Sequence, residues 1–255
     1  MVLSFKHTRM KQFTLIISAT ALLLFSSCET LNQAAQQVIT QGTGTLNPSA
    51  AEIALGLKQA LENGTSNSSQ RLSAQNGFLG NVAIKILFPP EAQKAERTLR
   101  SLGLNQLCDN VVTSLNRAAE DAAKEAKPIF INAIKQMTIT DATNILLGRQ
   151  DDAATQYFKR VTNSQLSEKF RPVIQNSLGK VGATKYWGDV VTRYNQIPLT
   201  ADINPDLASY VTQMAINGLF HEIAQEELKI RQNISARNTT LLQKVFGYAD
   251  RNRAN

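Results

Sequence analysis

Cysteine and histidine, which supply much of catalytic and metal-binding chemistry, are scarce in this chain. Its 255 residues include two Cys and two His, His7 and His221. A zinc protease of the His-Glu-x-x-His type needs two His one helical turn apart, but His221-Glu222-Ile223-Ala224-Gln225 has Gln at the second ligand position. We therefore interpret His221 as a helix-surface residue beside solvated Glu226 and Glu227. A catalytic triad would have to rely on this single imidazole.

Other motifs of catalysis and ligand binding are also missing. The chain has no Gly-x-Ser-x-Gly sequence and no Gly-rich phosphate loop. Asp202-Ile203-Asn204-Pro205-Asp206 begins like a calcium loop, but Leu207 and Gln213 stand where that loop needs Gly and Glu. A helix capped by Asn204, with Asp206 near its positive end, explains the same residues more simply. The sequence predicts no catalytic residue, no metal ligand and no cofactor.

The excess of positive charge is small once the first 27 residues are set aside. The formal net charge is +7, but residues 1–27 contain three of the 27 basic residues and none of the 20 acidic ones. A surface that binds nucleic acid needs Lys and Arg clustered on one face. The basic runs here are short and terminal, so we expect no nucleic-acid partner.

The first 27 residues have the order of a secretory signal. Lys6, Arg9 and Lys11 precede an apolar run at residues 13–25, which is shorter than the roughly 20 residues of a membrane-spanning helix. Small residues then precede Cys28, and this arrangement resembles a bacterial lipoprotein signal. The resemblance implies cleavage before Cys28 and diacylation of its thiol, although residue 25 is Phe where that signal usually has Leu. Alternatives are an ordinary secretory signal with a chance Cys, and a start at Met10.

These observations define the predicted domain organisation. Residues 1–27 form the signal peptide, and residues 28–47 a lipidated Cys and a flexible tether rich in Gln, Asn, Thr and Gly. Residues 48–247 form one domain, and residues 248–255 a disordered tail. With Cys28 lipidated, Cys108 is the only remaining thiol, so no intrachain disulfide can form. Its apolar neighbours predict a buried, unreactive thiol.

Apolar residues three and four positions apart dominate residues 48–247, and no regular alternation of strands with helices appears. The predicted fold class is therefore all-α, a multi-helix orthogonal or bundle-like domain of about eight to ten helices. At most one short extended segment is expected, near residues 84–88, where Pro89 ends the alternation.

Capping residues, Pro and Gly set the predicted helix boundaries. In the first half of the domain, the expected features are a first helix capped by Asn47 and broken at Asn63-Gly64, a turn at Asn76-Gly77, a helix from Pro90 to Gly103, a helix from Asn105, a restart at Pro128 and a short turn from Thr140 to Gly148. In the second half, they are a helix capped by Asp151, a kink or boundary at Pro172, a helix from Thr184 to Pro198, a longest helix at residues 206–231 opened by Asn204, and a short last helix before Gly247.

Several stretches in order resemble one family of bacterial envelope proteins, the domain of unknown function 4197. They are Leu115-Asn116-Arg117-Ala118-Ala119-Glu120-Asp121, Ala126-Lys127-Pro128-Ile129-Phe130, Asp151-Asp152-Ala153-Ala154-Thr155-Gln156-Tyr157, Val181-Gly182-Ala183-Thr184-Lys185-Tyr186-Trp187, Asn204-Pro205-Asp206-Leu207 and Leu242-Gln243-Lys244-Val245-Phe246-Gly247. The resemblance covers about residues 48–247. It implies a helical domain in a Gram-negative envelope and no known activity, ligand or catalytic residue.

The strongest candidate site is a polar row on one helix: Asn116, Arg117, Glu120 and Asp121. Arg117 lies three and four residues before the two carboxylates and can pair with them locally. Neighbouring alanines allow another helix to approach closely and to desolvate the row. We favour a satisfied structural network, with a ligand site as the alternative. The full set of candidate binding residues is Asn116, Arg117, Glu120, Asp121, Lys127, Tyr157, Tyr186 and Trp187.

The predicted function is a lipid-anchored domain with a binding or scaffolding role. We expect it to face the periplasm from the outer membrane, with the lipid as its membrane contact and an unknown protein or small molecule as its partner. The alternative is a hydrolase-like or metal-binding enzyme that uses Glu120 and Asp121. A third reading is an inner-membrane or surface-exposed lipoprotein, but Glu29 is not the Asp that favours inner-membrane retention in some bacteria.

Overall fold

The computed structural model describes residues 47–198, 203 and 206–253, which all lie in the compact unit Leu46–Asn255. The signal, Cys28 and almost all of the tether lie outside these residues. The described part contains nine α-helices, two 3-10 helices and no strand, which confirms the all-α prediction. The helices are α2 (Ala50–Ser73), η1 (Pro90–Ala92), α3 (Gln93–Ser101), α4 (Asn105–Ala123), α5 (Ala126–Gln136), α6 (Ile139–Leu147), α7 (Ala153–Lys180), α8 (Ala183–Asn195), α9 (Leu207–Gln232), η2 (Ile234–Ala236) and α10 (Thr240–Arg253).

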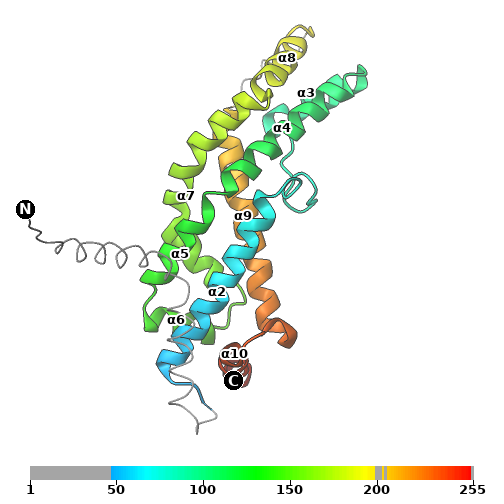
Figure 1. Ribbon diagram of the computed structural model, residues 1–255. Coiled ribbons are helices and arrows are strands. Elements are labelled where there is room, and N and C mark those ends of the chain that lie inside the picture. The colour runs from blue at the N-terminus through cyan, green and yellow to red at the C-terminus, as the bar shows by residue number, and fades with distance from the viewer. Residues whose placement is uncertain (1–46, 199–202, 204–205, 254–255) are drawn as a thin grey trace, which may run out of the picture. The chain divides into compact units, whose positions relative to one another are not determined.

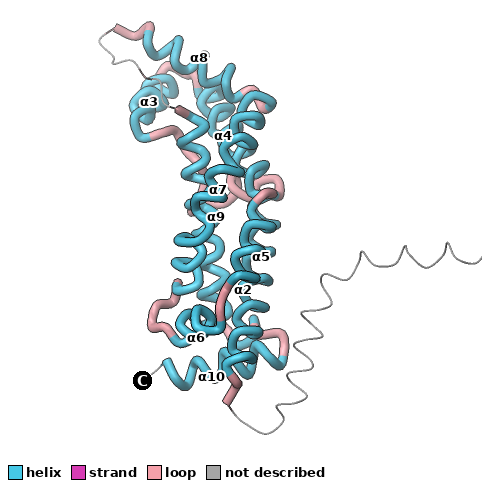
Figure 2. Tube along the Cα trace, turned by 90° about the vertical axis from the view of Figure 1, so that its left-hand side faces the viewer, coloured by secondary structure: helices cyan, strands magenta, loops and turns pink. Residues whose placement is uncertain are grey.

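The long helices pack side by side around one apolar core. α7 lies against α4 and α9, and α2 lies against α5, α6 and α9. At one end of these helices α3 packs with α8, and at the other α6 packs with α10 (Figures 1 and 2). Fully buried rings fill the interior, among them Phe130, whose centroid lies 5.1 Å from that of Phe158. The alanine face of α4 is fully buried, as its spacing predicts: Ala118, Ala119, Ala122 and Ala123.

Two helices run through positions where the sequence predicts interruptions. α2 continues past Asn63-Gly64, because at Gly64 a side chain would meet Cβ of Glu226 at 3.3 Å and the bare glycine lets α9 approach. α7 is one helix of 28 residues with Pro172 inside it, so the helix boundary that Pro172 could mark is absent. Phe170 and Ile174, which flank this proline, are fully buried. Tertiary packing therefore outweighs the local cost of Gly and Pro in a helix.

Several caps lie at other residues than those predicted. Ser49 forms a capping box with Glu52 at the start of α2, in place of Asn47. Thr138 forms one with Asp141 at the start of α6, in place of Thr140. Asp206 caps α9, and Asn204 lies outside the described residues. Capping boxes satisfy two main-chain donors reciprocally, which favours these pairs over a single cap.

The C-terminal helix is longer than predicted. α10 continues through Gly247 to Arg253, where the sequence predicts a disordered tail from residue 248. The Arg253 guanidinium donates from Nε to the Gly148 carbonyl at 2.6 Å and from Nη2 to Asp151 at 3.1 Å. These bonds attach the last turn of α10 to the loop between α6 and α7.

Cys108 is fully buried in α4, as its apolar neighbours predict. Burial raises the pKa of the Cys108 thiol above its usual value, although the charge of Arg100 opposes this rise. The thiolate is therefore disfavoured at neutral pH, which is typical of an unreactive structural cysteine.

Candidate functional site

The connecting segment, residues 74–89 between α2 and η1, has no regular helix or strand, and α4 holds it in place. Asn116 is fully buried on α4. Its Oδ1 accepts the N–H of Ile86 at 2.9 Å, and its Nδ2 donates to the Ile86 carbonyl at 2.8 Å and to the Val112 carbonyl at 2.7 Å. Both polar groups of Ile86 thus face one side chain, as in a hydrogen-bonded pair of strand residues. Ile86 is therefore extended, although the segment pairs with a side chain rather than with a strand.

Glu120, one turn further along α4, also binds main-chain groups of the connecting segment. Its Oε1 accepts the N–H groups of Phe78 and Leu79 at 3.2 and 3.3 Å, and its Oε2 accepts from Arg117 at 2.6 Å. Arg117 also donates to Oδ1 of Asn76 at 2.9 Å, and Asn76 has a left-handed φ of 68°. Both oxygens of the buried Glu120 carboxylate are engaged, so the arrangement has the form of a satisfied network around a turn.

Asp121 lies apart from this network. Its carboxylate pairs with Lys124 at 2.7 Å and accepts from the Ser177 hydroxyl at 2.6 Å, and its side chain is 41% exposed. Arg117 pairs with Glu120, and the expected pairing with Asp121 is absent among these contacts. Burial raises the pKa of Asp121, but hydrogen bonds and positive charge from Lys124, with the Ser177 bond, bring it below its usual value. The two candidate carboxylates therefore bond to different partners.

The remaining four candidates come from three helices, α5, α7 and α8, and their contacts do not bring them together. Lys127 is exposed on α5. Tyr157 is buried and donates to the Ala133 carbonyl at 3.4 Å. Tyr186 is half-buried, and Trp187 is buried with its ring centroid 5.8 Å from that of Phe88. Trp187 thus packs against the connecting segment, and the aromatic candidates serve packing. In the described part of the chain, no group of three or more His, Cys, Asp or Glu side chains is placed to hold a metal.

The structure forms a groove between residues 83–88 and α9, which the sequence did not predict. Its volume is about 410 Å³. Tyr210, Met214, Asn217 and His221 form one wall, at helical spacings that place them on one face of α9. Asn217 and His221 are exposed, and Met214 is half-buried. We call this feature the α9 groove. The spacing of these four residues was visible in the sequence, but the opposite wall depends on tertiary contacts.

Two contacts show which residues of the connecting segment lie opposite which residues of α9. At Gly218 a side chain would meet Phe78 at 2.7 Å and Ile84 at 3.3 Å, so the bare glycine lets the connecting segment touch α9. Further along, the Tyr210 hydroxyl donates to the Leu87 carbonyl at 3.2 Å. Residues 84–87 therefore run opposite to the direction of α9. The lengths of the two walls agree with this direction. Eight helical steps from Tyr210 to Gly218 span about 12 Å, and three extended steps from Ile84 to Leu87 span about 10 Å.

Tyr210 acts as a proton donor in this contact. Burial raises the pKa of Tyr210 above its usual value, and the negative charge of Glu91 raises it further. The hydroxyl therefore keeps its proton at neutral pH and can donate to the Leu87 carbonyl.

The acidic residues after His221 are paired rather than solvated. Arg71 bridges Glu222 at 2.9 Å and Glu226 at 2.8 Å, and Asn81 also donates to Glu222 at 2.9 Å. Arg71, Asn81 and Glu222 also border a second opening of about 320 Å³ beside the turn at Asn76. These contacts attach the start of the connecting segment to α9, so the expectation of solvated Glu226 is wrong.

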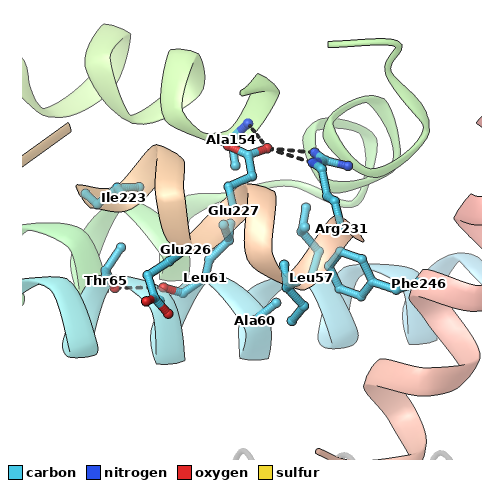
Figure 3. A pocket seen from close by; sticks show the side chains of 12 residues that line it. Leu57, Ala60, Leu61, Thr65, Ala154, Ile223, Glu226, Glu227, Arg231 and Phe246 are labelled. Atoms are coloured by element: carbon cyan, nitrogen blue, oxygen red, sulfur yellow. Dashed lines mark hydrogen bonds and ion pairs between the residues drawn. The ribbon is translucent and has the colours of Figure 1, made fainter. Parts of the chain in front are cut away.

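Glu227 is buried on α9, and its hydrogen bonds connect α9 to the start of α7. Its carboxylate accepts the N–H groups of Ala154 and Thr155, both at 2.9 Å, and so caps α7, where Asp151 was expected. Arg231 pairs with it at 2.7 Å (Figure 3). Arg231 also donates to the Ile145 carbonyl at 2.9 Å, near the end of α6. The adjoining cavity of about 20 Å³ is large enough for a single water molecule. This cluster joins α6, α7 and α9 and has no room for a larger ligand.

The fold and these contacts define an all-α domain whose buried polar residues hold loops and helix ends in place. The chain belongs to the family described as "Protein of unknown function (DUF4197)", whose model matches residues 47–247. The predicted family is thereby confirmed. No match was found among curated proteins or among solved structures. None of the described helices combines the length and apolar composition needed to cross a membrane.

Proposed function

We propose that this chain is a lipid-anchored binding module that faces the periplasm from the outer membrane, with the α9 groove as its contact surface. The sequence order that ends at Cys28 supports the anchor. The observation that supports binding is the groove itself, about 410 Å³ between an extended segment and a helix face. Ligand sites are typically concave, with a few polar groups among apolar ones.

Exposed apolar side chains support the same surface. Leu87, which lines the groove, is 51% exposed, and Val82, next to its Ala83 end, is 93% exposed. Exposed apolar side chains at the edge of a groove add apolar area with which a partner can make contact. The enzyme alternative gains no support, because the oxygens of Glu120 are engaged by main-chain N–H groups and by Arg117.

Photo-crosslinking in the host cell tests the binding role. A photoreactive amino acid at Asn217, exposed on the groove wall, should form specific adducts. The same replacement at Gln165, exposed on α7 and outside the groove lining, is the matched control. Equal labelling from both positions, or none from Asn217, would contradict a contact surface in the α9 groove.

Mass analysis of the native protein tests the anchor. The mature chain should begin at Cys28 with lipid on its thiol, and Cys28→Ser should leave the chain uncleaved or release it from the membrane fraction. An unmodified Cys28 in the native mature protein would refute lipidation.

A further inference from the structure

We propose that the α9 groove binds an extended polypeptide segment of a partner protein, which pairs in parallel with residues 85–87. This inference rests on the proposed function, because it names the ligand class of the same groove. It follows from the main-chain groups that the connecting segment presents there.

The polar groups of successive residues in an extended chain point to opposite sides. The N–H and carbonyl of Ile86 face Asn116 on α4. Those of Leu87 must then face α9, and the bond from Tyr210 to the Leu87 carbonyl shows that they do. The Lys85 carbonyl points the same way. Within the described residues, neither the Leu87 N–H nor the Lys85 carbonyl has a hydrogen-bond partner.

The vacant pair has the geometry of one parallel-strand bridge. In a parallel ladder, one residue of the incoming strand donates to the carbonyl of residue i−1 and accepts from the N–H of residue i+1. With i at Ile86, those two groups are the Lys85 carbonyl and the Leu87 N–H. An antiparallel partner would place two residues opposite Lys85 and Leu87, each facing one group that is already bonded, because the Lys85 N–H donates to the Asn81 carbonyl and the Leu87 carbonyl accepts from Tyr210. A parallel partner places one residue between them, and both of its main-chain groups face a group without a partner among the described residues. A peptide main chain is the ligand that offers a donor and an acceptor at this spacing.

The side chains around the groove define the composition of the segment. The described lining includes exposed Lys85 and His221 and no Asp or Glu. The peptide residue beside Lys85 is therefore acidic. The next residue has its side chain on the same face as that of Ile86, near half-buried Met214, and is apolar. The residue after it lies beside the exposed Leu87 side chain and is also apolar.

A matched pair of variants separates main-chain pairing from side-chain contact. Leu87→Pro removes the free N–H, and the residue before it, Ile86, is already extended as a proline requires. Leu87→Ala removes most of the side chain and keeps the N–H. The probe is a fluorescent pool of short peptides with a central Asp or Glu followed by two of Val, Ile or Leu in Ser/Thr flanks. Binding to the full chain in detergent is measured by anisotropy.

We expect the pool to bind and Leu87→Pro to weaken binding about tenfold or more, as loss of one buried hydrogen bond predicts, with a smaller loss for Leu87→Ala. If Leu87→Pro fails to fold, the unmodified chain is tested with a pool N-methylated at the apolar residue directly after the Asp or Glu, which then cannot donate to the Lys85 carbonyl. Two results overturn the inference. One is equal binding of the methylated and unmethylated pools to the unmodified chain, and the other is equal binding of the pool to Leu87→Pro and Leu87→Ala.

The crosslinking experiment distinguishes this failure from failure of the proposed function. If Asn217 crosslinks specifically but the peptide pool does not bind, the groove has a ligand of another class and the inference is wrong while the binding role stands. If neither occurs, both are wrong.

Discussion

The side-chain amide of Asn116 bonds both main-chain polar groups of Ile86, accepting at 2.9 Å and donating at 2.8 Å. One buried side chain thus substitutes for a neighbouring strand. The connecting segment has no ladder of its own, yet its buried main-chain groups require partners. Asn116 and Glu120 supply them from α4, while Phe78, Ile86 and Phe88 anchor the segment in the core. The polar row is therefore the support of the groove wall.

Removing one member of the Arg117–Glu120 pair should destabilise the domain. Arg117→Ala leaves the buried Glu120 carboxylate without its cation and Asn76 without a donor, which should cost about 2–3 kcal/mol. The melting temperature should fall by roughly 2–4 °C per kcal/mol. Asp121→Asn is the control, because its partly exposed pair with Lys124 should contribute less than about 1 kcal/mol.

An unchanged or raised melting temperature in Arg117→Ala would contradict this role. Unpaired groups kept at the expense of stability are typical of functional sites. That result would favour the alternative in which Glu120 serves as a ligand or acid–base group.

The Glu227–Arg231 pair should contribute more to stability, because its side chains are only 4% and 3% exposed. Glu227→Ala leaves Arg231 buried without its partner and removes the cap of α7, so we expect a loss of about 3–5 kcal/mol in urea unfolding. Glu226→Ala removes a neighbouring carboxylate whose partner Arg71 is 47% exposed, and should cost about 1 kcal/mol or less. Similar losses in the two variants would contradict the special role of Glu227.

Capping carboxylates should make the domain less stable in acid. Hydrogen bonds from the Thr138 hydroxyl and N–H lower the pKa of Asp141 below its ordinary 3.8, and bonds from the Ser209 N–H and hydroxyl lower that of Asp206. A lowered folded-state pKa contributes stability above the ordinary value, and this is lost as pH falls through the folded-state pKa. Urea midpoints should therefore drop below about pH 4, less steeply in Asp141→Asn. An identical acid profile in that variant would contradict the capping bond.

Close approach at Gly218 should make alanine unfavourable there. A Cβ would lie 2.7 Å from the buried ring of Phe78, so Gly218→Ala should cost about 1–3 kcal/mol and displace the connecting segment. A methyl group added at Gly188 in α8 would meet no atom within 4 Å, so Gly188→Ala should gain about 0.5–1 kcal/mol from helix propensity. Thermal melts of the two variants check this contrast. A stabilised Gly218→Ala would show that the segment does not press on α9.

Periodicity and composition were enough to predict the helical class and many helix starts, because spacing of apolar residues is a local property. Predictions from neighbouring residues failed where contacts between residues far apart in the chain determine helix length or capping. Gly64 lies inside a continuous helix because α9 packs against it, and exposed Pro172 lies inside one whose nearby Phe170 and Ile174 are buried in the core. Glu227 caps α7 from another helix, which spacing along the chain cannot indicate. The polar row was identified, but its partners at Asn76, Phe78 and Ile86 lie some 30–42 residues away in the sequence.

Amide hydrogen exchange at Ile86 and Leu87 in the full chain tests most directly whether α4 supports an open main-chain edge. We expect a slow Ile86 amide, bonded to Asn116, and a fast Leu87 amide, which has no partner among the described residues. In Asn116→Ala the Ile86 amide should become fast while the amides of the α9 interior stay protected. Equal exchange of Ile86 and Leu87 in the unmodified chain, or an Ile86 rate that Asn116→Ala leaves unchanged, would contradict this expectation.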